Sequence, residues 1–188
     1  GDFAFSAEER AAARQKLGIQ EDEVVALYVG RLSFHAKAHP HAMYAGLQAA
    51  ALRTGKKVTL VQCGWFANDA IKKSFTDGAA QFCPGVRALV ADGRDADARR
   101  QSWAAADLFI SLSDNIQETF GLTPIEAMAA GMPVVVTDWD GYKETVREGV
   151  DGFRIPTWMP PPNLGEGFAK AHETELENYD FYCGLACQ

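Results

Sequence analysis

The sequence has no long apolar run, no basic tract and little cysteine, and each absence excludes a class of protein. None of its apolar runs approaches the length needed to span a bilayer, so no transmembrane segment is expected. Lys and Arg number 18 against 25 Asp and Glu, which gives a net charge of −7. A nucleic-acid partner is therefore not expected, although isolated basic residues can still bind a phosphate inside a pocket.

Cysteine occurs at four positions, and none of them indicates a metal site. Cys63 lies in an apolar run and is expected to be a small buried side chain. Cys183 and Cys187 are one helical turn apart, but no second pair and no histidine accompanies them as a zinc site requires. The sequence thus predicts reduced thiols in a cytoplasmic protein.

The rest of the composition is typical of one globular domain, with 188 residues, 47% hydrophobic and 23% charged. Residues 1–20 are expected to form an N-terminal helix and linker, and residues 21–157 the main domain. Consecutive prolines from Pro160 to Pro162 exclude a regular helix or a central strand. Residues 158–188 are therefore expected to form a Pro-rich turn and a partly helical tail.

Apolar strand-like runs alternate with helical patterns along the chain. We expect strands at residues 24–29, 58–61, 86–90, 108–112, 133–137 and 153–155. We expect helices at residues 7–17, 67–75 and 95–105, the first of them starting with a Ser6–Glu9 capping box. A further helix is expected to end at Gly55 and to carry Met43, Gly46, Leu47 and Ala50 on one face. This alternation predicts an α/β fold, a Rossmann-like parallel sheet with helices on both faces.

Glycine and polar residues gather where the predicted strands end. Such positions include Gly30-Arg31, Gly64-Trp65, Asp92-Gly93 and the run from Ser113 to Asn115. Because parallel strands end at one edge of their sheet, these residues are expected to share that edge. Ligands of open α/β sheets bind there, so the sequence predicts a site at this edge.

Residues 117–136, QETFGLTPIEAMAAGMPVVV, form the most informative segment. Thr123 is expected to cap a helix with Pro124 at its first position, and Gly131 to end it. The glycine-containing approach to this helix start favours an anion, because unpaired N–H groups and the helix dipole both attract negative charge. Glu118 and Glu126, eight positions apart, suggest a ligand that also carries hydroxyl groups.

The run ETFGLTPIEAMAAGMPVV resembles the signature of retaining glycosyltransferases with the GT-B fold, of the family 4 type. Further family features occur in order between about Val24 and Pro156. The resemblance implies that this chain is the C-terminal, donor-binding half of a GT-B fold. It also implies that the N-terminal acceptor domain is absent, so that the chain is a fragment inactive by itself.

The resemblance assigns roles to individual residues. Arg31 and Lys37, which lies six residues later, would bind the donor diphosphate and stabilise the leaving group, as a guanidinium and an ammonium can. Glu118 would lie near the transferred sugar, and Glu126 would accept hydrogen bonds from the ribose hydroxyls. Backbone N–H groups would meet the sugar and the diphosphate at Phe120, Gly121, Leu122 and Thr123.

Local alternatives exist for these residues. Glu126 stands three residues after Thr123 and could complete a capping box instead, while Arg31 and Lys37 could be solvated loop residues. Asp140 occupies a position where many relatives carry glycine, and it is expected to cap the following helix. His35, His39 and His41 are expected to be polar residues at a helix start, with His35 as a second phosphate contact.

The resulting prediction is a retaining hexosyltransferase that needs neither metal nor cofactor. Its substrate would be a nucleoside diphosphate sugar, with a UDP-sugar expected and GDP- or ADP-sugars as alternatives, and its acceptor an unknown hydroxyl compound. In the family picture the leaving diphosphate helps to deprotonate the acceptor on the same face of the sugar. A non-catalytic nucleotide-sugar-binding or interaction module is the alternative. A nicotinamide-dependent oxidoreductase fits poorly, since residues 30–37 lack the Gly-x-Gly-x-x-Gly turn.

Overall fold

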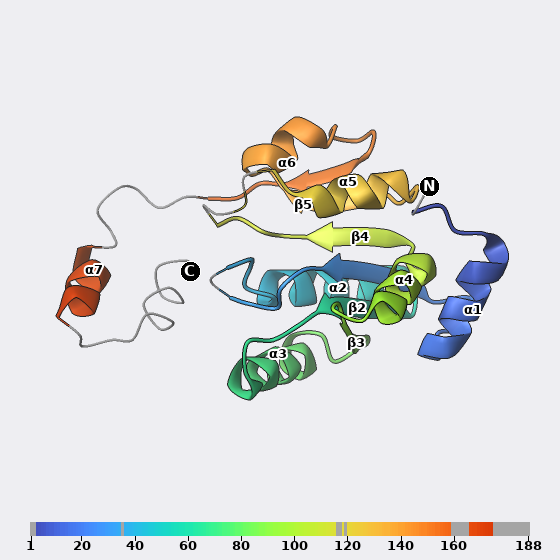
Figure 1. The fold of residues 1–188 in the computed structure, drawn as a ribbon, viewed down its shortest axis with the longest axis horizontal. Coiled ribbons are helices and arrows are strands. Elements are labelled where there is room, and N and C mark those ends of the chain that lie inside the picture. The colour runs from blue at the N-terminus through green and yellow to red at the C-terminus, as the bar shows by residue number, and fades with distance from the viewer. Residues whose placement is uncertain (1–2, 35, 116–117, 119, 159–165, 175–188) are drawn as a thin grey trace.

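The computed structural model describes residues 3–34, 36–115, 118, 120–158 and 166–174 (Figure 1). Cys183, Cys187 and His35 lie outside these residues, as do the three consecutive prolines. Within the described part of the chain, no helix is both long enough and apolar enough to cross a bilayer.

A parallel sheet forms the centre of the molecule. The described residues contribute six strands, in the order β3-β2-β1-β4-β5-β6. The strands are β1 (Val24–Val29), β2 (Val58–Gly64), β3 (Val86–Asp92), β4 (Leu108–Ser111), β5 (Val134–Thr137) and β6 (Gly152–Ile155). This parallel sheet confirms the predicted α/β fold. The nearly continuous apolar runs, such as Val24–Val29, form its strands because helices cover both faces of the sheet.

Helices connect these strands: α1 (Ala7–Leu17), α2 (His41–Thr54), α3 (Asp69–Phe82), α4 (Ala96–Ala105), α5 (Leu122–Ala129), α6 (Asp140–Thr145) and α7 (Glu166–Glu173). The capping box at the start of α1 is confirmed, since the Ser6 side chain accepts from Glu9 N–H and the Glu9 carboxylate accepts from Ser6 N–H. Gly55 ends α2 in a left-handed conformation, as predicted.

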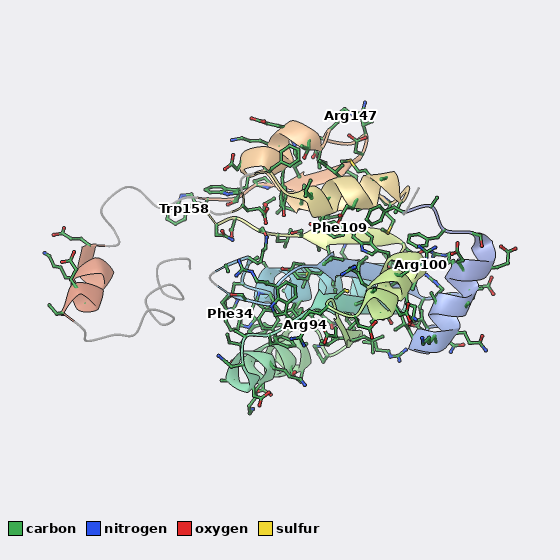
Figure 2. The ribbon with its side chains drawn as sticks, in the orientation of Figure 1. Phe34, Arg94, Arg100, Phe109, Arg147 and Trp158 are labelled. Atoms are coloured by element: carbon green, nitrogen blue, oxygen red, sulfur yellow. The ribbon has the colours of Figure 1, made fainter. Side chains whose placement is uncertain are left out.

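The helices cover the two faces of the sheet in separate groups. On one face α1, α4, α5 and α6 bury Trp103, Phe109 and Tyr142. Phe109 lies at the centre of the molecule on β4 and stacks on Trp103 at 5.9 Å between ring centroids (Figure 2). On the other face α2 and α3 bury Tyr44 and Phe75. This two-sided core fixes the sheet and leaves its carboxyl edge to the loops.

Two predicted helices differ from the observed ones. The helix expected at residues 67–75 begins at Asp69, because the Asn68 side chain caps it, and it continues to Phe82. In α2 the buried face includes Tyr44 and Ala51, whereas Gly46 and Ala50, which were expected to face the core, are exposed. The buried stripe of α2 therefore runs through Met43, Tyr44, Leu47 and Ala51, with Tyr44 fully buried.

Both predicted side-chain caps on the later helices are wrong. Helix α5 starts at Leu122 after Gly121, so Thr123 lies inside its first turn and accepts no capping hydrogen bond. Helix α6 starts at Asp140 itself after Trp139, again without a side-chain cap. Asp140 has a φ of 36°, a left-handed conformation for which glycine is better suited. In both cases a positive φ at the helix start sets the boundary, which side-chain preference alone does not reveal.

Candidate functional site

The order of the strands reverses between β1 and β4. The chain leaves β1 for α2 on one face of the sheet and leaves β4 for α5 on the other, so the two loops diverge. Such a switch point is where α/β sheets bind ligands, at the carboxyl ends of the strands. In Figure 1 these ends lie on the left of the sheet.

A pocket of about 490 Å³ lies at this switch point, within the usual size of ligand sites. We call it the donor pocket, after the ligand that the sequence resemblance predicts for it. It is lined by Tyr28, Val29, Gly30, Lys37, Ser111, Glu118, Phe120, Gly121, Leu122, Thr123 and Tyr142. Six residues predicted from the sequence are therefore brought together here: Lys37, Glu118, Phe120, Gly121, Leu122 and Thr123. Arg31 and Glu126 do not line this pocket.

Lys37 and Glu118 form an ion pair inside the donor pocket. Lys37 Nζ donates to Glu118 Oε2 at 2.7 Å, and the Glu118 residue is buried. The six-residue separation of Lys37 from Arg31 therefore still delivers the ammonium group to the pocket. A cation and an acceptor held side by side suit a ligand that carries both anionic and hydroxyl groups.

Asn115 links the two loops that carry this pair. Its side-chain amide donates to the Lys37 carbonyl at 2.5 Å, and its own carbonyl accepts from Glu118 N–H at 3.1 Å. The indole N–H of Trp139 donates to the same carbonyl at 3.0 Å. From the sequence, Asn115 was expected only to lie in the polar run at the end of a predicted strand. The structure instead makes it a cross-link between the loops.

Gly121 positions the start of α5 against the pocket. It has a φ of 74°, and an added Cβ would come within 2.0 Å of Tyr142 Cε1. Only glycine fits, for conformational and steric reasons together. The first N–H groups of a helix have no partner within the helix, so residues after Gly121 can offer them to an anion.

Glu126 lies further along α5 and is half-buried. Burial raises the pKa of its carboxyl, while the charge of Arg99 acts in the opposite direction. The capping-box interpretation of Glu126 is wrong, because α5 begins before Thr123 and has Gly121 as its N-cap. Glu126 is thus a partly desolvated carboxylate with no capping task. Arg99, which belongs to no motif of the sequence, is the cation whose charge lowers its pKa.

Arg31 lies at the edge of the donor pocket. It is exposed and directly follows Gly30, which lines the pocket. Its carbonyl accepts a hydrogen bond from the Tyr28 hydroxyl at 2.9 Å. The Arg31 guanidinium can therefore reach a ligand from the edge of the pocket, whereas Lys37 lines the pocket itself.

Three hydroxyl residues of the donor pocket were missed from the sequence. Tyr28 and Ser111 lie in apolar strands, and Tyr142 lies on α6, so each is easily taken for core packing. The hydroxyl oxygens of Tyr142 and Ser111 are 3.1 Å apart. Burial raises the pKa of Tyr142 to about 12, and the nearby Glu118 carboxylate acts in the same direction. The polar ends of these residues are buried at the site, a placement that no local pattern signals.

The described residues offer no group of three or more His, Cys, Asp or Glu side chains arranged to hold a metal ion. The rings of His39 and His41 meet edge to face at 4.0 Å between centroids. Burial lowers the pKa of both imidazoles, and for His39 the charge of His41 adds to this. Cys63 and Cys83 are buried free thiols. The histidines of the α2 start are thus packing partners among aromatic rings.

The sheet order and the pocket define a Rossmann-like domain of the kind that forms the C-terminal half of GT-B proteins. Residues 9–179 match the family described as glycosyl transferases group 1, and the chain belongs to that family. The resemblance drawn from the motif around Glu118 is therefore confirmed at the level of family and fold.

Two relatives illustrate the family. A lipopolysaccharide 1,2-N-acetylglucosaminetransferase of Salmonella typhimurium is 31% identical over 155 residues, which are 80% of this chain and 40% of that protein. A D-inositol 3-phosphate glycosyltransferase of Geodermatophilus obscurus is 31% identical over 163 residues, 80% of this chain and 34% of that protein. The chain therefore spans well under half the length of these relatives.

Solved structures with the same fold are more distant in sequence. Anabaena HepE in complex with UDP-glucose superposes with a TM-score of 0.61 at 24% identity, over 99% of this chain and 48% of HepE. WaaG, a glycosyltransferase involved in lipopolysaccharide biosynthesis, superposes with a TM-score of 0.62 at 23% identity, over 99% of this chain and 49% of WaaG. Each similarity establishes the fold.

Proposed function

We propose that the donor pocket binds a nucleoside diphosphate sugar, and that this chain is the donor-binding domain of a retaining hexosyltransferase. The observation that carries the proposal is the meeting of Lys37, Glu118 and the α5 start in one pocket at the switch point of the sheet. Membership of the family and the UDP-glucose complex of HepE support it. A UDP-sugar is the donor we propose.

Each part of the donor meets a matching group in this arrangement. The diphosphate lies against Lys37 and the N–H groups of residues 120–123, with Arg31 closing from the rim. The ribose extends beyond the pocket along α5, where its hydroxyls donate to Glu126, whose half-buried carboxylate can accept two hydrogen bonds. The sugar lies near Glu118. The hexose is placed where the cation and the carboxylate meet.

The reaction follows from this placement. The bond between the anomeric carbon and the diphosphate oxygen breaks, and the acceptor oxygen bonds to the same face of the sugar. Because the acceptor attacks the face from which the diphosphate departs, the configuration of the sugar is retained without a covalent enzyme intermediate. The acceptor proton passes to the departing phosphate oxygen. Fixed cations aimed at the developing phosphate charge supply the stabilisation for which other enzymes use a divalent metal, so we propose a metal-independent reaction without a cofactor.

Acceptor recognition and turnover require more than this chain. The relatives are more than twice as long as the segment matched, and we propose that an N-terminal domain supplies the hydroxyl acceptor site. Residues 1–188 alone should then bind donor without transferring sugar. A cytoplasmic location is part of the same proposal. The alternative of a non-catalytic binding module predicts that the longer protein also fails to transfer.

Calorimetric titration with UDP, GDP, ADP and UDP-glucose, in the presence of EDTA, tests the proposal. We expect saturable binding of UDP and UDP-glucose, weakened by about tenfold or more in Lys37→Ala and Glu126→Ala, since each loses a charge-assisted contact. Lys72→Ala is the matched control, because Lys72 is exposed on α3 and lies outside the pocket. Absence of binding, or equal loss in all three variants, would refute the assignment of the pocket.

A further inference from the structure

We propose that Tyr28 and Tyr142 are positioning residues that hold the two loops of the donor pocket, one loop each. Tyr28 does so by a hydrogen bond from its hydroxyl to the loop, and Tyr142 by its ring, which its hydroxyl ties to β4. The inference rests on the proposed donor function. Neither tyrosine belongs to a motif of the sequence, and each lies beneath a glycine of the pocket. They act by positioning the backbone of the two loops that carry the donor-binding groups.

Tyr28 holds the loop between β1 and α2. Its ring is buried, and its hydroxyl donates to the Arg31 carbonyl at 2.9 Å. The same oxygen lies against Gly30, where an added Cβ would come within 3.0 Å of it. The loop therefore folds over the hydroxyl. Backbone hydrogen bonds hold the residues on either side of Arg31, from Gly30 N–H to the Cys63 carbonyl and from Leu32 N–H to the Trp65 carbonyl, and the Tyr28 hydroxyl adds the bond that holds the Arg31 carbonyl itself.

Tyr142 holds the loop between β4 and α5. Its ring lies beneath Gly121, closely enough that no Cβ fits there. Its hydroxyl is 3.1 Å from Ser111 Oγ at the end of β4. The ring thus supports the α5 start while the hydroxyl ties the ring to the sheet. Glu118 and Tyr142 line the same pocket.

A phenylalanine at either position could fill the same space but could not make the hydrogen bond. Burial raises the pKa of both tyrosines, so both hydroxyls stay protonated at neutral pH and Tyr28 remains a donor. The Tyr→Phe exchange therefore removes one hydroxyl while keeping the ring. A change in the loop that follows this exchange therefore reflects the lost hydrogen bond and not a loss of ring packing.

Tyr44 provides the matched control. It is fully buried, and its hydroxyl donates to Gln62 Oε1 at 2.8 Å, between α2 and β2. It does not line the donor pocket. Tyr44→Phe therefore removes a buried tyrosine hydroxyl of the same kind without touching either loop. A purely structural role for Tyr28 and Tyr142 predicts that all three variants behave alike.

The first test is UDP binding by the 188-residue chain and its variants, measured by calorimetry together with Tm. We expect Tyr28→Phe and Tyr142→Phe each to raise the Kd for UDP by about fivefold, the usual worth of a hydrogen bond. Tyr44→Phe should lower Tm at least as much and leave the Kd unchanged. Equal Kd values in all three variants and the parent would overturn the inference while leaving the donor site intact.

The second test needs no ligand. Amide exchange measured by NMR follows Leu32 N–H, which donates to the Trp65 carbonyl at 3.0 Å, and Glu118 N–H, which donates to the Asn115 carbonyl at 3.1 Å. We expect Tyr28→Phe to speed exchange at Leu32 only and Tyr142→Phe at Glu118 only, by about fivefold. Unchanged exchange at both amides, or the same change in Tyr44→Phe, would refute loop positioning. Failure of the parent to bind UDP would refute the donor function, and the exchange rates would still decide this inference.

Discussion

Lys37 Nζ lies 2.7 Å from Glu118 Oε2, although 81 residues separate the two in the sequence. The pair joins the loop after β1 to the loop before α5, across the switch point of the sheet. A diphosphate that reaches Lys37 also approaches the Glu118 carboxylate, because the two groups are in contact. In the proposed donor complex, Glu118 would therefore favour the sugar hydroxyls and oppose the phosphate charge.

Glu118→Gln is expected to separate these two effects. Removing the negative charge should tighten UDP binding by about threefold to fivefold, since like charges across a partly screened pocket repel weakly. The additional affinity that UDP-glucose gains over UDP should fall. Calorimetry with both ligands measures the two effects, and Glu21→Gln at an exposed site is the control. Weaker UDP binding in Glu118→Gln would contradict this account of the pair.

Gly121→Ala is expected to disrupt the pocket, and Gly55→Ala provides a direct comparison. Both glycines have positive φ, 74° and 66°, but an added Cβ meets Tyr142 at Gly121 and open space at Gly55. Gly55→Ala should cost about 1 kcal/mol of unfolding free energy from conformation alone, and Gly121→Ala about 3 kcal/mol or more. Chemical denaturation gives both values. UDP binding should be lost only in Gly121→Ala, and similar losses of stability would show that Tyr142 moves aside freely.

Arg14 is expected to be the main polar anchor of α1. It is 6% exposed, donates to the carbonyls of Ala105 and Gln20, and pairs with Asp107 at 2.5 Å. Arg14→Met should lower the unfolding free energy by about 3 kcal/mol, because it leaves buried acceptors and a carboxylate without that partner. Lys73→Met breaks an exposed pair within α3 and should cost less than about 0.5 kcal/mol. Equal costs in denaturant titrations would contradict the anchoring role.

Glu126 is expected to make donor binding dependent on pH. Burial raises the pKa of its carboxyl, so the group takes up its proton at a higher pH than an ordinary glutamate does. In the proposed complex the ionised form accepts both ribose hydrogen bonds, and the affinity for UDP should therefore fall as the pH decreases through this raised pKa. Calorimetry of UDP binding between about pH 4.5 and 7 measures the fall.

Glu126→Gln is the control, since it keeps the titration of the UDP phosphate and removes that of the carboxyl. The affinity of the parent for UDP, divided by that of Glu126→Gln, should decrease as the pH is lowered. The effect on stability has the opposite sign to the effect on binding. Because the pKa of Glu126 is raised in the folded protein, ionisation of this carboxyl destabilises the folded protein. Glu126→Gln should therefore raise Tm slightly at neutral pH, and a lower Tm would show that the ionised carboxylate is stabilised by neighbours such as Arg99.

The local elements were largely predictable because their signals are local. The apolar run at residues 24–29 became β1 with the same limits, and the Ser6–Glu9 capping box starts α1. The starts of α5 and α6 were mispredicted, because Gly121 and Asp140 begin these helices with positive φ values and without side-chain caps. A preference for side-chain caps does not reveal such a backbone conformation, and the Tyr142 ring that leaves no room for a Cβ at Gly121 comes from a different helix.

The sequence by itself determined the alternation of strands and helices, the family and most of the residues that line the pocket. Periodicity and motif spacing act over a few residues, so one chain segment is enough to carry them. Only the tertiary structure decided that Lys37 meets Glu118, that Asn115 joins their loops, and that Tyr28 and Tyr142 support them. Those contacts depend on which strands become neighbours, and a hydroxyl inside an apolar segment carries no local sign of the carbonyl it will meet.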